Sequence, residues 1–600
     1  MNETSTFDQP APGEKAKARS EIPRLRLPSM AVLLYWIATF VLAAIDKPYF
    51  FGFMFGLLTA ILLTLVVLGW WWFNRAVRLR DKALGFAFLL AEAILVGRLA
   101  DRSISPFTLW MSGFPLVATL VIAWLLIAKS RRIAAPRRGL AIAVTVAWAY
   151  FLVIRIDGAD SRLKFKSHWR WTPTPEQEFL ANAKTVGKGR LLTPAKEQAK
   201  LEPLPGDWTC FRGPERDGVI RGSNISTNWS VNPPTLVWKH SVGPAWSALL
   251  VVGPRLYTQE QRGTQEAIVC YDAETGEQIW VHEDVARFDE QVSGPGPRAT
   301  PTFADGRLYV VGGTGLLNCL DASTGASLWQ QDIKGASDAK LPMWAFSGSP
   351  LVTGDLVIVY AGGEAGKGLL AYRAQTGELA WTTAAGNSTY SSPQITTIAG
   401  VPQCLMLHDS GLTSVDVATG KKLWATGTAM KGAPRTGQPR LIEGNKLLVA
   451  ALGGLGCSLI EVTKTGEQWS AADKWESKGL KPEFPDLVVH KGFAYGFDVG
   501  IFCCINLADG KRCWKDGRYG RGQVVLLADQ QLLLVSTESG QLVLLAPDPT
   551  AHKELASFQA IEGKTWNYPL VRGNRVYLRN AQEMACYSLS GKSPRLAGAH

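Results

Sequence analysis

Seven aromatic and basic side chains in the C-terminal two-thirds of the chain are the ones best suited to hold a ligand. Each lies in a short segment, often ending in proline, that precedes an expected β-strand: Trp246, Arg298, Trp344, Tyr390, Arg435, Tyr519 and Trp566. Aromatic rings stack on flat groups, and arginine binds carboxylates through two parallel hydrogen bonds. If the segments meet around one opening, these residues could bind a flat, anionic molecule. Alternatively, the aromatic rings only pack neighbouring sheets together.

The sequence offers no motif for a catalytic residue or a metal site. Glu483, Asp486 and Asp498 are the acidic residues nearest to the expected ligand segments, but no spacing argument selects among them. The chain lacks Cys-x-x-Cys-His, which attaches c-type haem, and His-Glu-x-x-His, which binds zinc. The glycine-rich run at 312–315 precedes a strand, whereas a phosphate loop would open a helix.

The nine cysteines are interpreted as packing residues. Cys270, Cys319 and Cys504 occupy equivalent positions of a repeat, and such positions are too far apart to form disulfides with one another. Adjacent side chains of a strand point to opposite faces, so a bridge between Cys503 and Cys504 would break the strand. The alternative is a vicinal disulfide. The odd number of cysteines leaves at least one free thiol.

A short turn followed by a tryptophan recurs through the C-terminal two-thirds of the chain. The clearest copies are residues 272–276 before Trp280, 321–325 before Trp329, 373–377 before Trp381 and 416–420 before Trp424. Weaker copies precede Trp469 and Trp514, and Trp238 and Phe558 fit the same position at the two ends. Aspartate and threonine cap the turn, and glycine supplies a positive φ. A period of about 40–50 residues is that of a four-stranded propeller blade.

Two counts indicate eight blades. Eight outer strands carry the tryptophan position, and eight short segments lead into inner strands. The strand at Trp238 lacks three inner partners, whereas the last three strands, ending at Tyr587, lack an outer one. Pairing them closes the ring and removes free edges. We therefore predict an all-β, eight-bladed propeller over residues 206–592, followed by a tail at 593–600.

The first quarter of the chain predicts an α-helical membrane bundle of about five transmembrane helices. After a cytoplasmic disordered tail at 1–28, five apolar runs occupy about 29–45, 49–73, 83–100, 107–128 and 139–156. Each approaches the ~20 residues needed to span a bilayer. Glu92 lies inside the third run and is either a functional carboxyl or one that pairs with a neighbouring helix. No short apolar segment with a cleavage site is found, so a cleaved signal peptide is not expected.

Charge placement predicts the orientation of this bundle. Lysine and arginine are concentrated between runs two and three and between runs four and five. By the positive-inside rule, the N-terminus is cytoplasmic and the chain after residue 157 lies outside. These clusters also explain much of the net charge of +12, so we expect no nucleic-acid partner. Residues 157–205 predict an extracytoplasmic stalk, with a capping box at Thr174–Gln177 that begins a helix at about 175–185.

The Asp-Ala-x-Thr-Gly-x-x-x-Trp repeat resembles the quinoprotein, or PQQ-like, β-propeller family. Asp207-Trp208 and Phe211-Arg212-Gly213-Pro214 resemble the first motif of PQQ-like repeat proteins from environmental bacteria. The resemblance covers about residues 206–592. It implies the fold strongly and the function weakly, because the family includes both PQQ-dependent dehydrogenases and a non-catalytic outer-membrane-assembly lipoprotein.

The sequence is therefore consistent with two functions. The first is a binding or scaffolding propeller anchored in the bacterial inner membrane, with the lipid bilayer as one partner and a periplasmic protein or polymer as another. The second, implied by the resemblance, is a dehydrogenase that uses PQQ with Ca²⁺ and passes electrons to the membrane quinone pool. Membrane-bound glucose dehydrogenases have a similar layout. The blades here are close to minimal length, which leaves little room for active-site loops and favours the binding function.

Overall fold

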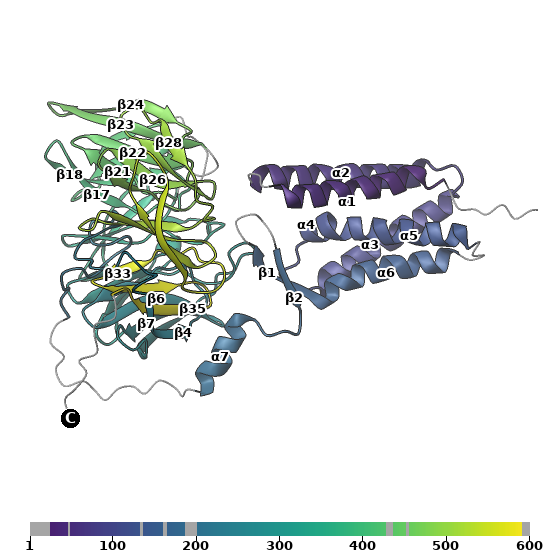
Figure 1. Cartoon of the computed structure of the whole chain (residues 1–600), viewed down its shortest axis with the longest axis horizontal. Coiled ribbons are helices and arrows are strands. Elements are labelled where there is room, and N and C mark those ends of the chain that lie inside the picture. Colours follow the sequence, from purple (N-terminus) through teal and green to yellow (C-terminus); the bar gives the residue numbers. More distant parts are fainter. Residues whose placement is uncertain are drawn as a thin grey trace, which may run out of the picture. The chain divides into compact units, whose positions relative to one another are not determined.

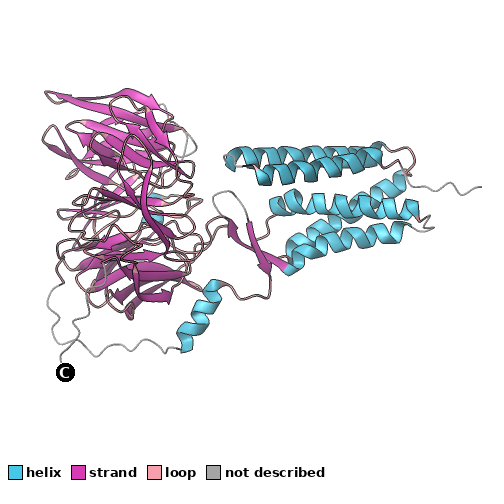
Figure 2. Cartoon of the chain, in the orientation of Figure 1, coloured by secondary structure: helices cyan, strands magenta, loops and turns pink. Residues whose placement is uncertain are grey.

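The computed structural model describes residues 24–45, 49–131, 136–159, 165–185, 201–427, 436–451 and 455–590. The chain forms two compact units, Met1–Thr172 and Pro173–His600, which are helical and mostly β-stranded respectively (Figure 1; Figure 2). Residues 1–23 and the tail predicted at 593–600 lie outside the described residues. Residues 157–205, predicted to form a stalk, fall partly in each unit.

The first unit is a helical bundle. Its elements are α1 (Arg26–Ala44), α2 (Tyr49–Phe73), α3 (Leu79–Leu99), α4 (Pro106–Thr108), the π-helix η1 (Leu109–Gly113), α5 (Phe114–Ser130), α6 (Pro136–Val153), β1 (Ile154–Ala159) and β2 (Phe165–Trp169). Among the described residues, three spans are long and apolar enough to cross a membrane: Arg26–Ala44, Gly52–Phe73 and Pro106–Ser130. The structure therefore does not confirm the predicted number of five. Helices α3 and α6 are not among the three spans, and both carry charged residues.

Glu92 bonds to a neighbouring helix at the partly exposed surface of the bundle. Its Oε1 accepts a hydrogen bond from the Thr145 hydroxyl of α6 at 3.2 Å. The neighbouring interior is apolar and includes Trp148 and Phe151, both 3 % exposed. This arrangement corresponds to the structural role considered for Glu92, a carboxyl that bonds to the next helix.

The second unit is an eight-bladed propeller, as the repeat predicts. Blade 1 contains β5 (Leu250–Val252), β6 (Arg255–Arg262), β7 (Gln265–Asp272) and β8 (Gln278–Val285). Blade 2 contains β9 (Thr302–Ala304), β10 (Arg307–Val311), β11 (Leu316–Asp321) and β12 (Ser327–Asp332), which leads into α8 (Ile333–Ser337). Blade 3 contains β13 (Leu351–Thr353), β14 (Leu356–Tyr360), β15 (Leu369–Arg373) and β16 (Leu379–Thr383). Blade 4 contains β17 (Gln394–Ile398), β18 (Val401–His408), β19 (Gly411–Asp416) and β20 (Lys422–Thr426).

The remaining blades complete and close the ring. Blade 5 contains β21 (Arg440–Glu443), β22 (Lys446–Ala451), β23 (Gly456–Thr465) and β24 (Gln468–Ser477). Blade 6 contains β25 (Val488–His490), β26 (Phe493–Asp498), β27 (Ile501–Asn506) and β28 (Arg512–Lys515). Blade 7 contains β29 (Gln523–Leu527), β30 (Leu532–Ser536), β31 (Gln541–Ala546) and β32 (Lys553–Gln559), with β3 (Val219–Ile220) as a fifth strand. Blade 8 joins β33 (Leu570–Arg572), β34 (Arg575–Arg579) and β35 (Glu583–Ser588) to β4 (Thr235–Ser241), which confirms the predicted closure.

The repeated tryptophan ties most blades to the next, whereas Trp424 of blade 4 donates to Gln403 of its own blade. The indole Nε1 of Trp280, for example, donates to the Ala322 carbonyl in the turn of blade 2 at 3.1 Å. The glycine of that turn, Gly325, has φ 76°, and a Cβ there would lie 2.6 Å from the Trp280 ring. The turn therefore needs glycine both for its backbone conformation and for the contact with the ring of the preceding blade.

Blades 5 and 7 depart from the predicted positions. In blade 5, Trp475 rather than Trp469 donates to the next blade, at the Leu507 carbonyl (3.0 Å). The reason is the hairpin of β23 and β24, whose ten-residue strands carry the turn and Trp469 beyond the usual position. In other blades the tryptophan stands at the register shift between the third and fourth strands. In blade 7 Ala556 occupies that position, and Phe558 lies two residues further along β32.

The cysteines are packing residues in the structure. All nine thiols are free, and Cys513 is the only one that is exposed. Cys503 packs in the core between blades 5 and 6, whereas Cys504 packs in the core between blades 6 and 7. The two neighbours thus point to opposite faces of β27, and the alternative of a vicinal disulfide is not observed.

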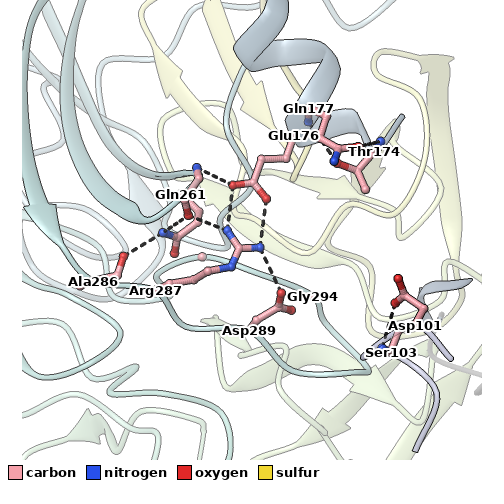
Figure 3. A network of polar contacts seen from close by, with 12 residues as sticks. Asp101, Ser103, Thr174, Glu176, Gln177, Gln261, Ala286, Arg287, Asp289 and Gly294 are labelled. Atoms are coloured by element: carbon pink, nitrogen blue, oxygen red, sulfur yellow. Dashed lines mark hydrogen bonds and ion pairs between the residues drawn. The ribbon is translucent and has the colours of Figure 1, made fainter. Parts of the chain in front are cut away.

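Helix α7 (Pro175–Thr185) belongs to the propeller unit and docks on blade 1. The predicted capping box is formed, because Thr174 and Gln177 exchange two hydrogen bonds of 2.8 and 3.0 Å. Glu176 then accepts from the Gly263 amide at 2.7 Å and from both terminal nitrogens of Arg287 at 2.9 and 3.1 Å (Figure 3). The helix is thus bonded to the β6–β7 hairpin through its first turn.

Candidate functional site

Residues 207–220 cross the central channel of the propeller, and we call this segment the plug. Trp208 pairs with Val251 of blade 1 through two backbone hydrogen bonds, and β3 pairs in parallel with β29 of blade 7. Between these ends the plug contacts the other six blades, so a single segment reaches all the inner strands around the ring. The sequence motif at 207–214 was interpreted only as a mark of the family.

Arg212 is the centre of the plug. It is 2 % exposed, and its guanidinium bonds to the Asp486 carboxylate and to the Leu487 carbonyl at 2.6 Å, both at the start of blade 6. The guanidinium also lies 5.6 Å from the centre of the Tyr568 ring of blade 8. Arg216 donates to the carbonyls of Ser349 and Pro350 in blade 3. Two buried arginines thereby connect opposite sides of the ring.

A belt of hydrogen bonds surrounds the channel where the inner strands begin. In it, a backbone N–H of one blade donates to a side chain of the next: Ala248 to Thr300 (3.2 Å), Thr300 to Ser349 (2.9 Å), Ser349 to Ser392 (2.9 Å), Ser392 to Gln438 (3.3 Å) and Gln438 to Asp486 (3.1 Å). On the remaining side, Asn567 of blade 8 donates to the Ser247 carbonyl at 2.7 Å. The polar residue before the repeated proline therefore joins neighbouring blades.

Aromatic rings cover the channel mouth, the end at which the inner strands begin. Trp566 of blade 8 has its ring centre 4.7 Å from Trp246 of blade 1 and 4.7 Å from Phe484 of blade 6. The row therefore joins residues of three blades across the mouth, past the intervening blade 7. Lys564 lies over the same row, 4.3 Å from the Trp566 ring and 5.1 Å from the Trp246 ring. We call these four residues the aromatic row.

A second aromatic pair lies in blades 3 and 4. The ring centres of Trp344 and Tyr390 are 5.0 Å apart. Arg298 is close enough for its charge to lower the pKa of Tyr390, although burial, the larger effect, raises that pKa overall. The loop that follows β8 connects the pair to the aromatic row, since Trp246 Nε1 donates to the Ser293 carbonyl at 3.0 Å.

Arg298 holds this loop together. It donates to Ser293 Oγ at 2.6 Å and to the Gly294 carbonyl at 2.9 Å, and its guanidinium stacks 4.4 Å from the Phe288 ring centre. Burial lowers its pKa to about 10, against the opposing effect of Glu290. The geometry therefore directs this guanidinium to the loop rather than to a ligand.

The structure brings candidate residues together in two pairs, Trp246 with Trp566 and Trp344 with Tyr390, and Arg298 bonds to the loop that Trp246 contacts. Tyr519 lies apart, because its hydroxyl bonds at 2.9 Å to both His552 and Glu554, on the outer side of blade 7. Arg435 lies outside the described residues. Lys564 and Phe484 were missing from the prediction, although each stands in one of the segments that precede inner strands.

The three acidic candidates are all paired with cations. Glu483 bonds to Arg521, and Asp486 bonds to Arg212. Asp498 is fully buried and contacts a cluster of three cations, Lys481, Arg512 and Lys515. In the part of the chain that the structure describes, no group of three His, Cys, Asp or Glu side chains could hold a metal ion. These carboxylates do not fit the Ca²⁺ ligands that a PQQ site requires.

Glu266 is an acidic residue near the mouth that the sequence did not single out. It is 4 % exposed, its Oε2 accepts from the Gly313 amide at 2.9 Å, and its Oε1 has no hydrogen-bond partner. Burial raises its pKa to about 7. Glu266 is thus a buried ionisable group near the loop that Arg298 holds.

Comparison with known proteins identifies the repeat. A PQQ-repeat family profile, described as outer membrane protein assembly factor BamB, matches residues 264–516. The propeller is of the PQQ-like repeat type. The chain is similar to the outer membrane protein assembly factor BamB of Burkholderia pseudomallei (strain K96243), at 24 % identity over 363 residues, which is 55 % of this chain and 84 % of the relative.

Solved structures with similar propellers include a BamB protein and a quinohemoprotein alcohol dehydrogenase. BamB from Moraxella catarrhalis has a TM-score of 0.44 at 16 % identity and covers 59 % of this chain and 99 % of its own. The quinohemoprotein alcohol dehydrogenase ADHIIG from Pseudomonas putida HK5 has a TM-score of 0.49 at 14 % identity and covers 66 % of this chain and 82 % of its own.

Proposed function

We propose that this protein is a membrane-anchored propeller that binds a periplasmic protein or polymer at its channel mouth. The observation that carries the proposal is the aromatic row, in which rings from blades 8, 1 and 6 meet at the mouth beside the Lys564 ammonium. Half-buried aromatic rings with an adjacent cation supply the large contact area and the charge typical of binding hot spots.

The ligand that fits this surface best is an acidic, partly apolar segment. The Lys564 ammonium lies over the rings, 4.3 Å from the centre of the Trp566 ring, and it is partly exposed at the mouth. Carboxylates of a partner would pair with such cations, while its apolar side chains would cover the rings. The similarity to a BamB protein, whose name is that of an assembly factor, supports a protein partner.

The apolar spans of the first unit support a membrane anchor, and the basic loops support a cytoplasmic N-terminus. The inner membrane of a bacterium, with the propeller in the periplasm, is the location consistent with both. The paired state of Glu483, Asp486 and Asp498 favours this function over a PQQ-dependent dehydrogenase.

The proposal is tested by photo-crosslinking in cells. Benzoylphenylalanine replaces Trp344 or Tyr390 at the mouth, and Val285, which is 85 % exposed on blade 1, serves as the control position. We expect the two mouth positions to yield the same discrete adducts and the control to yield none of them. Absence of adducts at the mouth would contradict a binding role. Tight uptake of PQQ with Ca²⁺ and dye reduction by the full-length protein would favour the dehydrogenase instead.

A further inference from the structure

The helical bundle contains an apolar cavity of about 410 Å³ near the ends of four helices. Its walls come from α2, α3, α5 and α6, with Val67, Leu89, Val121 and Val144 as representative side chains. The cavity is therefore a place where a hydrocarbon chain can pack between helices.

One end of the cavity is charged. Arg78, Asp81 and Arg137 lie at that end, and the Arg137 guanidinium bonds to the Asp81 carboxylate at 2.9 Å. This contact holds Arg137 at the edge of the cavity while 67 % of its side chain stays exposed. The described residues at this end, 74–82, 129–131 and 136–138, together carry eight Lys and Arg but one acidic residue. Anionic groups are attracted to such a surface.

Two tryptophans place this end at the level of lipid headgroups. Trp70 and Trp71 line the cavity in the last turn of α2. Their indole nitrogens donate to the Arg24 carbonyl at 3.0 Å and to the Lys82 carbonyl at 3.3 Å. Tryptophan is enriched at membrane interfaces because its ring is apolar and its N–H needs a polar partner.

We propose that this cavity binds an anionic phospholipid, with one acyl chain between the four helices and the phosphate at Arg137. The proposal rests on the membrane location proposed above. The apolar walls select a hydrocarbon chain, and the basic end selects a negative headgroup over a zwitterionic one. The pair of Asp81 and Arg137 sets the position of the guanidinium that meets the phosphate.

The test uses the full-length protein, extracted in detergent and stripped of lipid. Native mass spectrometry measures the binding of phosphatidylglycerol and phosphatidylcholine that carry identical acyl chains. We expect the wild-type protein to prefer phosphatidylglycerol by about fivefold, the effect of one well-placed cation. Arg137→Gln should abolish this preference, whereas Arg137→Lys and the adjacent Arg138→Gln should retain it.

A second pair of variants tests the acyl-chain site without changing charge. Ala141 lines the cavity on α6, so Ala141→Trp should fill it and remove binding of both lipids. Ile142, the next residue, is 64 % exposed, and Ile142→Trp should leave binding unchanged. Equal binding of the two lipids by the wild type, or unchanged binding by Ala141→Trp, would overturn the proposal. A protein that stays soluble without detergent would instead overturn the membrane location itself.

Discussion

The plug predicts a large penalty for removing Arg212. Its guanidinium is almost completely buried and bonds to Asp486, which also accepts hydrogen bonds from the Gln438 and Leu487 amides. Arg212→Ala leaves the Asp486 carboxylate buried at the centre of the ring without its cation. Breaking a buried ion pair in this way costs about 3–5 kcal/mol.

The expected change in thermal stability follows from the size of the propeller. With an unfolding entropy proportional to chain length, this cost lowers the melting temperature of the propeller by roughly 4–6 °C. The tryptophans between the blades make intrinsic fluorescence of the full-length protein a direct measure of this transition. Arg221→Ala, which removes an exposed arginine next to the plug, is the matched control and should change stability by less than about 0.5 kcal/mol.

A double-mutant cycle checks the physical cause. Arg212→Met alone leaves the Asp486 carboxylate unpaired and Asp486→Asn alone leaves Arg212 unpaired, whereas the two substitutions combined remove both charges. We expect the double variant to be more stable than the sum of the single effects predicts, by at least about 1 kcal/mol. Additive effects, or a melting temperature of Arg212→Ala within a degree of the wild type, would refute the ion pair as the anchor of the plug.

Three further predictions concern the mouth, the belt and the repeat. The raised pKa of Glu266, about 7, means that the unfolded chain loses this proton first as pH rises, so stability should fall between about pH 4.5 and 7; Glu266→Gln should remove that slope and stabilise the protein by about 3 kcal/mol at pH 8, as thermal unfolding across pH would show. Ser349→Ala leaves the buried Thr300 amide without its acceptor and should cost about 1–3 kcal/mol in denaturant unfolding, and a neutral result would discount the belt. Trp475→Ala should destabilise the propeller by about 3 kcal/mol, whereas Trp469→Ala should cost less than about 1 kcal/mol, and the reverse order would restore Trp469 to the repeat position.

The fold could be predicted because its determinants are local and repeated. The turn glycine and the tryptophan recur in most blades, and their contact, as between Gly325 and Trp280, joins neighbouring blades. The closure by β4 followed from counting unpaired strands. The shift from Trp469 to Trp475 could not be predicted, since the length of the β23–β24 hairpin is not set by the turn motif.

The candidate site was predicted in part for the same reason. Trp246 and Trp566 were found because they precede inner strands, and all such segments converge at one end of the channel. The role of Arg298 could not be predicted. Its partners Ser293 and Gly294 belong to the loop just before it, and no sequence motif marks that loop. The plug was missed because the partner of Arg212 lies 274 residues away, at Asp486.

Crosslinking at the channel mouth tests directly whether a partner binds at the aromatic row. The yield of the adducts formed by benzoylphenylalanine at Tyr390 is compared in the wild-type background, in Trp566→Ala and in Trp469→Ala, which removes the same side chain from an outer hairpin. We expect Trp566→Ala to abolish most of the adducts and Trp469→Ala to leave their yield unchanged. An equal yield in all three backgrounds would contradict binding at the channel mouth.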